Sequence, residues 1–308
     1  MTRSTIGTAL SLIMSLTLPG ATGCRKASVA QDVAGDSIVL QARQARLDLT
    51  LDQPDSVSAT TPIALWKLPN HLREISGLAL TGDGRLLTHG DERGTVFEID
   101  YRRGVIVKEF TAGSPPIHGD FESIAIDGDT VMLLTSDGIL YRFLEGAHKA
   151  VVPYTRVDTE LGSKCEFESM VFDAAARSLL LACKQVHDRA LKDSLIIFRY
   201  PLDPGPVGGI KKVPHLAVSM VTLVGSAGWE GFHPSDMAID PINGNYVLLA
   251  SREKALAEIT PTGEVIFVRP LPPGHNQPEG LAITKDHLVI ISDEANAGPA
   301  TITLYRWP

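Results

Sequence analysis

The chain has 308 residues, of which 44% are hydrophobic, and a formal net charge of −8. A chain of this length and apolar content can bury a full core, which excludes bulk disorder. The negative charge and the absence of any long run of Lys and Arg argue against nucleic acid as a partner, because neutralising phosphates needs a basic face.

Residues 1–23 have the pattern of a secretory signal peptide. Arg3 supplies the positive start, and residues 6–18 form a short apolar stretch. The segment that follows, Ala21-Thr22-Gly23-Cys24, is similar to a bacterial lipobox, in which the cysteine carries the lipid, although leucine is usual where Ala21 stands. We therefore expect Cys24 to become the lipidated first residue. The alternative is an ordinary cleaved signal peptide with a cysteine there by chance.

A lipid on Cys24 would anchor the mature chain to a membrane. Arg25 and Lys26 follow it, with no aspartate to favour inner-membrane retention, so we expect a lipoprotein of the outer membrane that faces the periplasm. Residues 24–58 are mostly polar with little periodicity, which predicts a flexible tether to a folded domain over residues 59–308. No later segment reaches the ~18 apolar residues that a membrane-spanning helix needs.

A six-residue phrase recurs five times in that domain. It reads EISGLA from Glu74, DFESIA from Asp120, EFESMV from Glu166, HPSDMA from His233 and QPEGLA from Gln277. The third residues of the phrases, at spacings of 46, 46, 67 and 44, are Ser76, Glu122, Glu168, Ser235 and Glu279. Each phrase leads into an apolar run, a turn and a second apolar run. Strand-rich repeats in the forties are typical of propeller blades, so the sequence predicts one all-β domain, a five-bladed β-propeller.

Further strands are expected before and within these repeats. Residues 63–69 form the first convincing strand, and we expect it to supply the outer strand of the last blade, closing the ring. The third strand of each blade is expected at 94–99, 138–143, 195–200, 255–259 and 301–306. The long spacing between the third and fourth phrases predicts an insertion over 203–218, which its Pro and Gly content marks as a loop.

Cys165 and Cys183 have two interpretations. Cys165 lies just before one predicted strand and Cys183 near the end of the strand expected to pair with it, and an oxidising compartment permits a disulfide. The alternative is two buried thiols that pack as small hydrophobic groups.

The phrases, the segment Ile291-Ser-Asp-Glu294 and residues 249–266 resemble the SdiA-regulated (YjiK-like) family of bacterial propellers over roughly residues 62–308. The resemblance implies a five-bladed β-propeller, distantly related to NHL-repeat proteins, with a bound calcium ion and no established reaction. The chain departs from the family at His233 and Asp236, where relatives tend to have an acid and a glycine, and Gln277 is neutral.

The acidic phrase positions are expected to meet at the channel mouth, because the first strand of every blade lines the channel. Carboxylates held close together must raise their pKa values, find cationic partners or bind a cation, and calcium accepts a ring of oxygen ligands. The predicted calcium ligands are Glu122, Glu168, Glu279 and Asp293, with Glu74, Asp120, Glu166 and His233 as possible further residues of the mouth. The alternative is a polar ring that only binds water and is neutralised by nearby Lys and Arg.

Two functions fit this pattern. The first is a monomeric, lipid-anchored binding module for a protein or small molecule. The second is a calcium-dependent hydrolase acting on an ester, lactone or phosphoester, with His118 or His233 as the base. The sequence carries no nucleophile elbow, zinc-protease or phosphate-loop motif, which favours the binding module.

Overall fold

In the computed structural model the chain is described over residues 24–52, 60–202 and 214–307, with the backbone alone over 24–36. The chain divides into two compact units, residues 1–43 and 44–308, which are described separately. The expected signal peptide lies outside the described residues. Within the described ranges, no helix is both long and apolar enough to cross a membrane.

The segment expected to be an irregular tether contains helix α1 (Cys24–Leu51), which continues from the first unit into the second. Within the second unit its last turns contact the blades. Leu47 is 2% exposed and packs in the core between the first and last blades. Arg306 donates from Nη2 to the carbonyls of Thr50 and Leu51 at 3.3 and 2.7 Å. Leu47 and Leu51 lie four residues apart on one face of the helix. One such apolar pair is too short a pattern for sequence periodicity to predict a helix here.

Five antiparallel sheets of four main strands form the second unit, with β5 also pairing in parallel with the short β9 (Val151–Val152). The first blade contains β2 (Ile75–Leu80), β3 (Leu86–Gly90), β4 (Thr95–Asp100) and β5 (Val105–Ala112). The second contains β6 (Phe121–Asp127), β7 (Thr130–Thr135), β8 (Ile139–Leu144) and β10 (Tyr154–Asp158). The third contains β11 (Cys165–Asp173), β12 (Ser178–Val186), β13 (Ser194–Pro201) and β14 (Leu216–Ser219).

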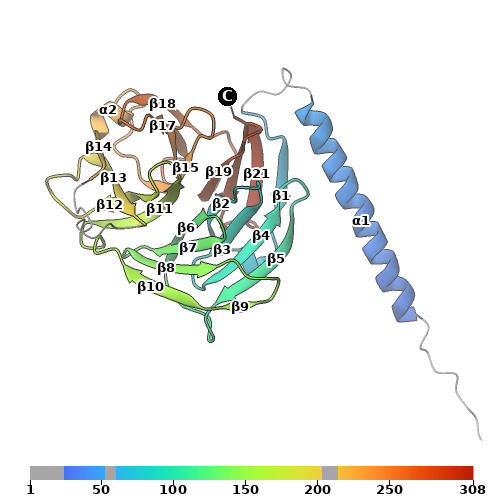
Figure 1. Cartoon of the computed structure of the whole chain (residues 1–308). Coiled ribbons are helices and arrows are strands. Elements are labelled where there is room, and N and C mark those ends of the chain that lie inside the picture. The colour runs from blue at the N-terminus through green and yellow to red at the C-terminus, as the bar shows by residue number, and fades with distance from the viewer. Residues whose placement is uncertain (1–23, 53–59, 203–213, 308) are drawn as a thin grey trace, which may run out of the picture. The chain divides into compact units, whose positions relative to one another are not determined.

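The fourth blade contains β15 (Pro234–Ile239), β16 (Tyr246–Ala250), β17 (Ala255–Ile259) and β18 (Val265–Pro270). The fifth contains β19 (Pro278–Ile283), β20 (Leu288–Asp293), β21 (Thr301–Arg306) and β1 (Ala64–Lys67). The first strands β2, β6, β11, β15 and β19 surround the centre of the ring, as Figure 1 shows. The predicted five-bladed β-propeller and its third strands are therefore confirmed.

The hydrophobic core lies between neighbouring blades. Five clusters of buried side chains each join two adjacent sheets, the last of them joining the fifth blade to the first. Strands that are apolar on both faces, such as β16 with the buried pattern YVLLA, can supply two clusters at once. This explains why the second strand of each blade reads as a continuous apolar run.

Strand β1 closes the ring as predicted. It pairs antiparallel with β21, from Ala64 opposite Leu304 to Lys67 opposite Thr301. Trp66 also donates from Nε1 to the carbonyl of Tyr101 at 2.7 Å, which joins the closing strand to the first blade. The first and last blades are thus held together by a strand from the start of the domain, which is the outermost strand of the fifth sheet.

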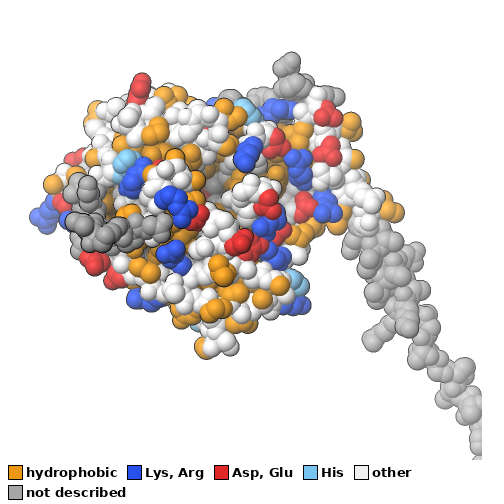
Figure 2. Space-filling model, in the orientation of Figure 1, with side chains coloured by type: hydrophobic (Ala, Val, Ile, Leu, Met, Phe, Trp, Pro, Cys, Tyr) orange, Lys and Arg blue, Asp and Glu red, His pale blue; other side chains and the backbone are white. Residues whose placement is uncertain are grey.

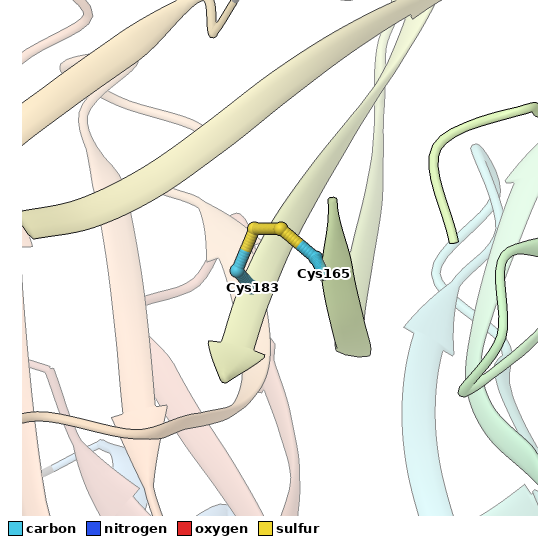
Figure 3. Close-up of a disulfide and its surroundings, with 2 residues drawn as sticks. All are labelled: Cys165 and Cys183. Atoms are coloured by element: carbon cyan, nitrogen blue, oxygen red, sulfur yellow. A yellow bond between two sulfur atoms is a disulfide. The ribbon is translucent and has the colours of Figure 1, made fainter. Parts of the chain in front are cut away.

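Cys165 on β11 and Cys183 on β12 form a disulfide, with their Cα atoms 5.4 Å apart (Figure 3). Of the two interpretations of these cysteines, the structure has the bridged one. The bond lies in the strand pair that carries Glu166, Glu168 and Lys184.

The expected insertion divides into two parts. Residues 203–213 lie outside the described part of the chain, and residues 216–219 form β14 rather than a loop. The following connection, residues 220–233, contains the short helix α2 (Met220–Val224). It is the longest of the five connections between a fourth strand and the next first strand, the others spanning 68–74, 113–120, 159–164 and 271–277.

Ring closure at Trp66 predicts a sensitive glycine. Gly104 has φ +71°, and a Cβ added there would lie 2.4 Å from Cγ of Trp66. We expect Gly104→Ala to lower the free energy of unfolding by about 2–4 kcal/mol, through backbone strain and displacement of the indole. Gly128→Ala, with φ +60° and open space around its Cβ, is the matched control and should cost about 1 kcal/mol. Denaturant unfolding measures both, and equal costs would contradict a role for the Trp66 contact.

Candidate functional site

The register of the blades places two sets of side chains at one end of the channel. One set is the third phrase position, at the start of each first strand. The other set lies at or near the end of the second strand. The second residues of the five phrases pair with second-strand residues, which are Gly90, Thr135, Cys183, Ala250 and Asp293. The next residues therefore occupy equivalent places around the axis, and they are Asp91, Ser136, Lys184, Ser251 and Glu294.

A cavity of about 180 Å³ lies between these two sets. Its charged lining consists of six carboxylates and one ammonium group, those of Glu74, Asp91, Glu122, Glu168, Glu279, Glu294 and Lys184. Four of the predicted residues, Glu74, Glu122, Glu168 and Glu279, are thus brought together. On the face shown in Figure 2, acidic and basic side chains lie beside one another, so surface charge alone does not mark a site. The acids of the mouth are distinguished because they line one cavity.

Two of these carboxyl groups have strongly raised pKa values. Burial, followed by the neighbouring Asp120 carboxylate, raises the pKa of Glu122 to about 8, although Lys184 opposes the shift. Burial also raises the pKa of Glu279 to about 7, against the effect of Ser251, whose Oγ donates to Oε1 at 3.1 Å. Loss of water favours the neutral acid in both cases, and a bound cation would favour the charged form instead.

The second set of acids behaves in the same way. Burial raises the pKa of Asp91, with the Glu74 carboxylate as the next cause. Burial followed by Asp91 and Glu74 raises the pKa of Glu294, while Arg73 opposes it. The cavity therefore holds more negative charge than its own positive groups balance.

Lys184 is the one Lys or Arg side chain in the described lining of this cavity. Its ammonium contacts Oε1 of Glu168 and lies 3.9 Å from Oε1 of Glu166. The Glu168 side chain is 9% exposed, so this ion pair is largely shielded from water on the carboxylate side. Lys184 forms an ion pair with Glu168, whereas Glu122 and Glu279 have no cation in contact within the described residues.

Asp293, a predicted calcium ligand, does not line the cavity. Its carboxylate is buried, 5% exposed, and accepts from His275 Nδ1 at 2.6 Å and from the amide of Asn276 at 2.9 Å. His275 Nε2 in turn accepts from the Tyr305 hydroxyl at 2.9 Å. Asp293 therefore holds the chain just before β19 in place. Alternation along β20 turns the next residue, Glu294, toward the mouth instead.

The other possible mouth residues are also outside the cavity. Asp120 is exposed and accepts from Oγ of Ser136 at 2.6 Å. Glu166 is half-buried, and its Oε1 lies 3.9 Å from the Lys184 ammonium. Sequence reasoning missed Asp91, whose signal is its position directly after a second strand, equivalent to Lys184 and Glu294.

His233 lies in a separate groove of about 880 Å³ between the third and fourth blades. Its Nδ1 donates to Oε1 of Glu253 at 2.8 Å, and its amide donates to Oε2 at 3.1 Å. Lys184 lines both this groove and the acidic cavity, so its side chain stands between them. His118 is exposed and lines neither space.

Asp236 occupies the fourth phrase position, one residue further along its first strand than the third-position set. It is 1% exposed, and its carboxylate accepts from the amides of Leu281, Met237 and Leu78 at 2.7, 2.8 and 3.3 Å. Burial raises the pKa of Asp236 well above its usual range, against these three donors. This side chain therefore joins the fourth blade to the fifth and the first.

The raised pKa of Glu122 predicts a pH-dependent stability. The pKa of Glu122 is about 8 in the folded state and has its ordinary value of 4.5 in the unfolded state, so between these pH values only the folded state keeps the proton. The stability that this difference contributes is complete below pH 4.5 and is lost as pH rises through 8. Glu122→Gln cannot ionise. We expect it to raise the free energy of unfolding at about pH 9 in EDTA by on the order of 2 kcal/mol, with little change near pH 4.

The exposed Glu264 provides the control, since Glu264→Gln makes the same chemical change outside the cavity. Urea unfolding at the two pH values measures both variants. A Glu122→Gln protein that is destabilised equally at both would show that its carboxylate is not electrostatically strained.

No family model and no curated protein matches this chain. Among solved structures, it is similar to the luciferin-regenerating enzyme, at 8% identity and TM-score 0.51 over 80% of this chain and 95% of that one. It is also similar to Myxococcus xanthus glutaminyl cyclase, at 15% identity and TM-score 0.50 over 79% and 94%. A third is the PQQ-bound aldose sugar dehydrogenase of Streptomyces coelicolor, at 13% identity and TM-score 0.49 over 79% of this chain and 98% of that one. At these identities the first two likenesses show the fold alone. The chain is a β-propeller, and its chemistry rests on its own residues.

Proposed function

We propose that this chain is a cell-envelope propeller that binds calcium at the channel mouth and binds a protein or small molecule on the same face. The observation that supports the calcium proposal is the set of six carboxylates around a cavity of about 180 Å³ with one ammonium group among them. The expectation that Cys24 carries a lipid, placing the protein at the outer membrane facing the periplasm, belongs to the same proposal.

The donor set suits calcium. Calcium takes six to eight oxygen ligands in flexible geometry, and the lining offers carboxylate oxygens with Ser76 and Gln277 beside them. Within the described residues, no three His, Cys, Asp or Glu side chains already converge on one point as metal ligands. Glu122, Glu168 and Glu279 would therefore have to draw together around the ion, and Lys184 would leave Glu168. The raised pKa values of Glu122 and Glu279 provide a driving force, because burial disfavours their charged forms and a bound cation would stabilise those forms.

The proposed family is the SdiA-regulated (YjiK-like) group. The five phrases in order, the five blades and the strand from the start of the domain that closes the ring are what support it. The departures at His233 and Asp236 have structural partners in Glu253 and in the amide of Leu281. The fourth blade therefore contributes no acid to the mouth, and the calcium ligands would come from the other four blades.

A calcium-dependent hydrolase is the alternative, and it needs a base beside the ion. His233 is oriented toward Glu253 in the neighbouring groove, and His118 is exposed outside both spaces. The geometry therefore favours binding over hydrolysis at the mouth.

The test is the melting temperature of the purified chain in EDTA and in excess calcium. A ligand that binds only the folded state stabilises it by mass action, by about 2.7 kcal/mol at 100 times its Kd. For a chain of this size we expect a rise of about 5 °C or more with calcium. The double variant Glu122→Gln with Glu168→Gln should lose this rise.

Glu264→Gln, which changes an exposed carboxylate, is the control and should keep the full calcium response. Absence of a calcium response in the unsubstituted chain, with no metal detected by mass spectrometry of the native protein, would contradict the proposal. The acids would then form a structural ring in which some carboxyl groups remain protonated.

A further inference from the structure

The groove between the third and fourth blades is a second candidate site, and the calcium proposal does not use it. It has a volume of about 880 Å³. The connection from β12 to β13 supplies Lys192 and Asp193, the long connection 220–233 supplies Trp229 and Glu230, and the connection from β16 to β17 supplies Arg252. The buried side chains of Leu195 and Phe232 also line it. The groove therefore combines an apolar surface with charged groups of both signs.

His233 is held in a defined orientation at this groove. Glu253 accepts from both its ring Nδ1 and its amide, and the Glu253 side chain is 9% exposed. Gly231 lies against the ring, where an added Cβ would be 2.9 Å from Cε1. A proton on Nδ1 leaves Nε2 of the neutral imidazole as a hydrogen-bond acceptor. The His233 side chain remains 31% exposed, so this acceptor is accessible from the groove.

Some charged side chains of the groove have an ion-pair partner within the described part of the chain, and others have none. Lys184 is paired with Glu168, and Glu253 with His233. Within the described part of the chain, the side chains of Lys192, Arg252, Asp193 and Glu230 make no ion pair or hydrogen bond, and all four are exposed. Two positive and two negative groups are therefore available to a ligand.

We propose that this groove binds a zwitterion with an apolar side chain, namely a free apolar amino acid. Its carboxylate would be recognised by Arg252 and Lys192, and its ammonium group by the Nε2 acceptor of His233 with Asp193 and Glu230. Its apolar side chain would pack on Trp229 and Phe232. A simple organic anion would leave the two acids and the His233 acceptor without a partner, and a simple amine would leave the two cations without one.

This inference names a ligand class for the binding module, and it needs no metal. The experiment is therefore done in EDTA, where loss of calcium binding cannot affect its outcome. Isothermal titration of the full chain with L-phenylalanine, L-leucine, L-methionine and L-tryptophan gives the affinities. Phenylpropionate, which lacks the ammonium group, and phenethylamine, which lacks the carboxylate, are the matched probes.

We expect at least one of the four amino acids to bind, and L-phenylalanine to bind about tenfold more tightly than either of its two analogues. Arg252→Ala with Lys192→Ala should weaken amino-acid binding about tenfold or more. Arg156→Ala with Lys285→Ala removes the same two charge types at exposed positions outside the groove and should change nothing. Because all four residues are exposed, both double variants should fold, which their melting temperatures check.

A third variant tests the role of His233. Glu253→Gln keeps the size of the residue but removes the charge that fixes the imidazole, and we expect it to weaken L-phenylalanine binding while phenylpropionate is unaffected. Three results would overturn the proposal: no binding of any of the four amino acids at millimolar concentration, equal binding of phenylpropionate and L-phenylalanine, or equal affinities in the groove and control variants.

Discussion

Contacts around the axis, between each first strand and the neighbouring blade, hold the propeller together. Between the first three blades, the backbone amide of the second phrase residue donates to a backbone carbonyl of the preceding blade. Phe121 donates to the carbonyl of Asp91 at 2.7 Å, and Phe167 to the carbonyl of Ser136 at 2.9 Å. The fourth and fifth phrases have proline there and no N–H to donate. Between these blades the side chains take over, as Ser235 donates to the carbonyl of Pro278 at 2.9 Å and Asp236 accepts from Leu281 at 2.7 Å. These contacts hold the first strands close together and bring the acids at their starts into one cavity.

The contacts that hold the first strands close together also place buried carboxylates beside one another at the channel mouth, which is electrostatically unfavourable. Removing carboxylates from water next to one another raises their pKa values, and Lys184 relieves only part of the repulsion by pairing with Glu168. A protein gains no stability from such an arrangement at neutral pH, so its presence is more easily explained by a ligand than by folding. Lys184 also connects the two candidate sites, because it lines both the acidic cavity and the groove that contains His233. Any cation that displaces it from Glu168 would change the charge of the groove as well.

Sequence reasoning predicted the fold and most of the cavity, and its errors have specific causes. Phrase periodicity identified Glu74, Glu122, Glu168 and Glu279, because a repeated position in a closed ring must face the same axis. Asp293 was expected beside them, but it is the last residue of β20 and bonds His275, whereas Glu294 one residue later reaches the mouth. Asp91 has the same position in the first blade and belongs to no phrase. Strand ends shift by one residue with local register, and one residue reverses the direction of a side chain.

The sequence by itself determined the number of blades, the closing strand and the acids of the phrases, since each depends on periodicity within a local segment. The Cys165–Cys183 pairing was one of two open interpretations until the strands were paired. Only the tertiary structure showed that Lys184 divides two cavities, that Glu253 orients His233, and that the residues of α1 nearest the blades pack on them through Leu47. These features join residues from different blades or from outside the repeat. Their positions follow from how whole sheets pack around the axis, a property that no local pattern of residues expresses.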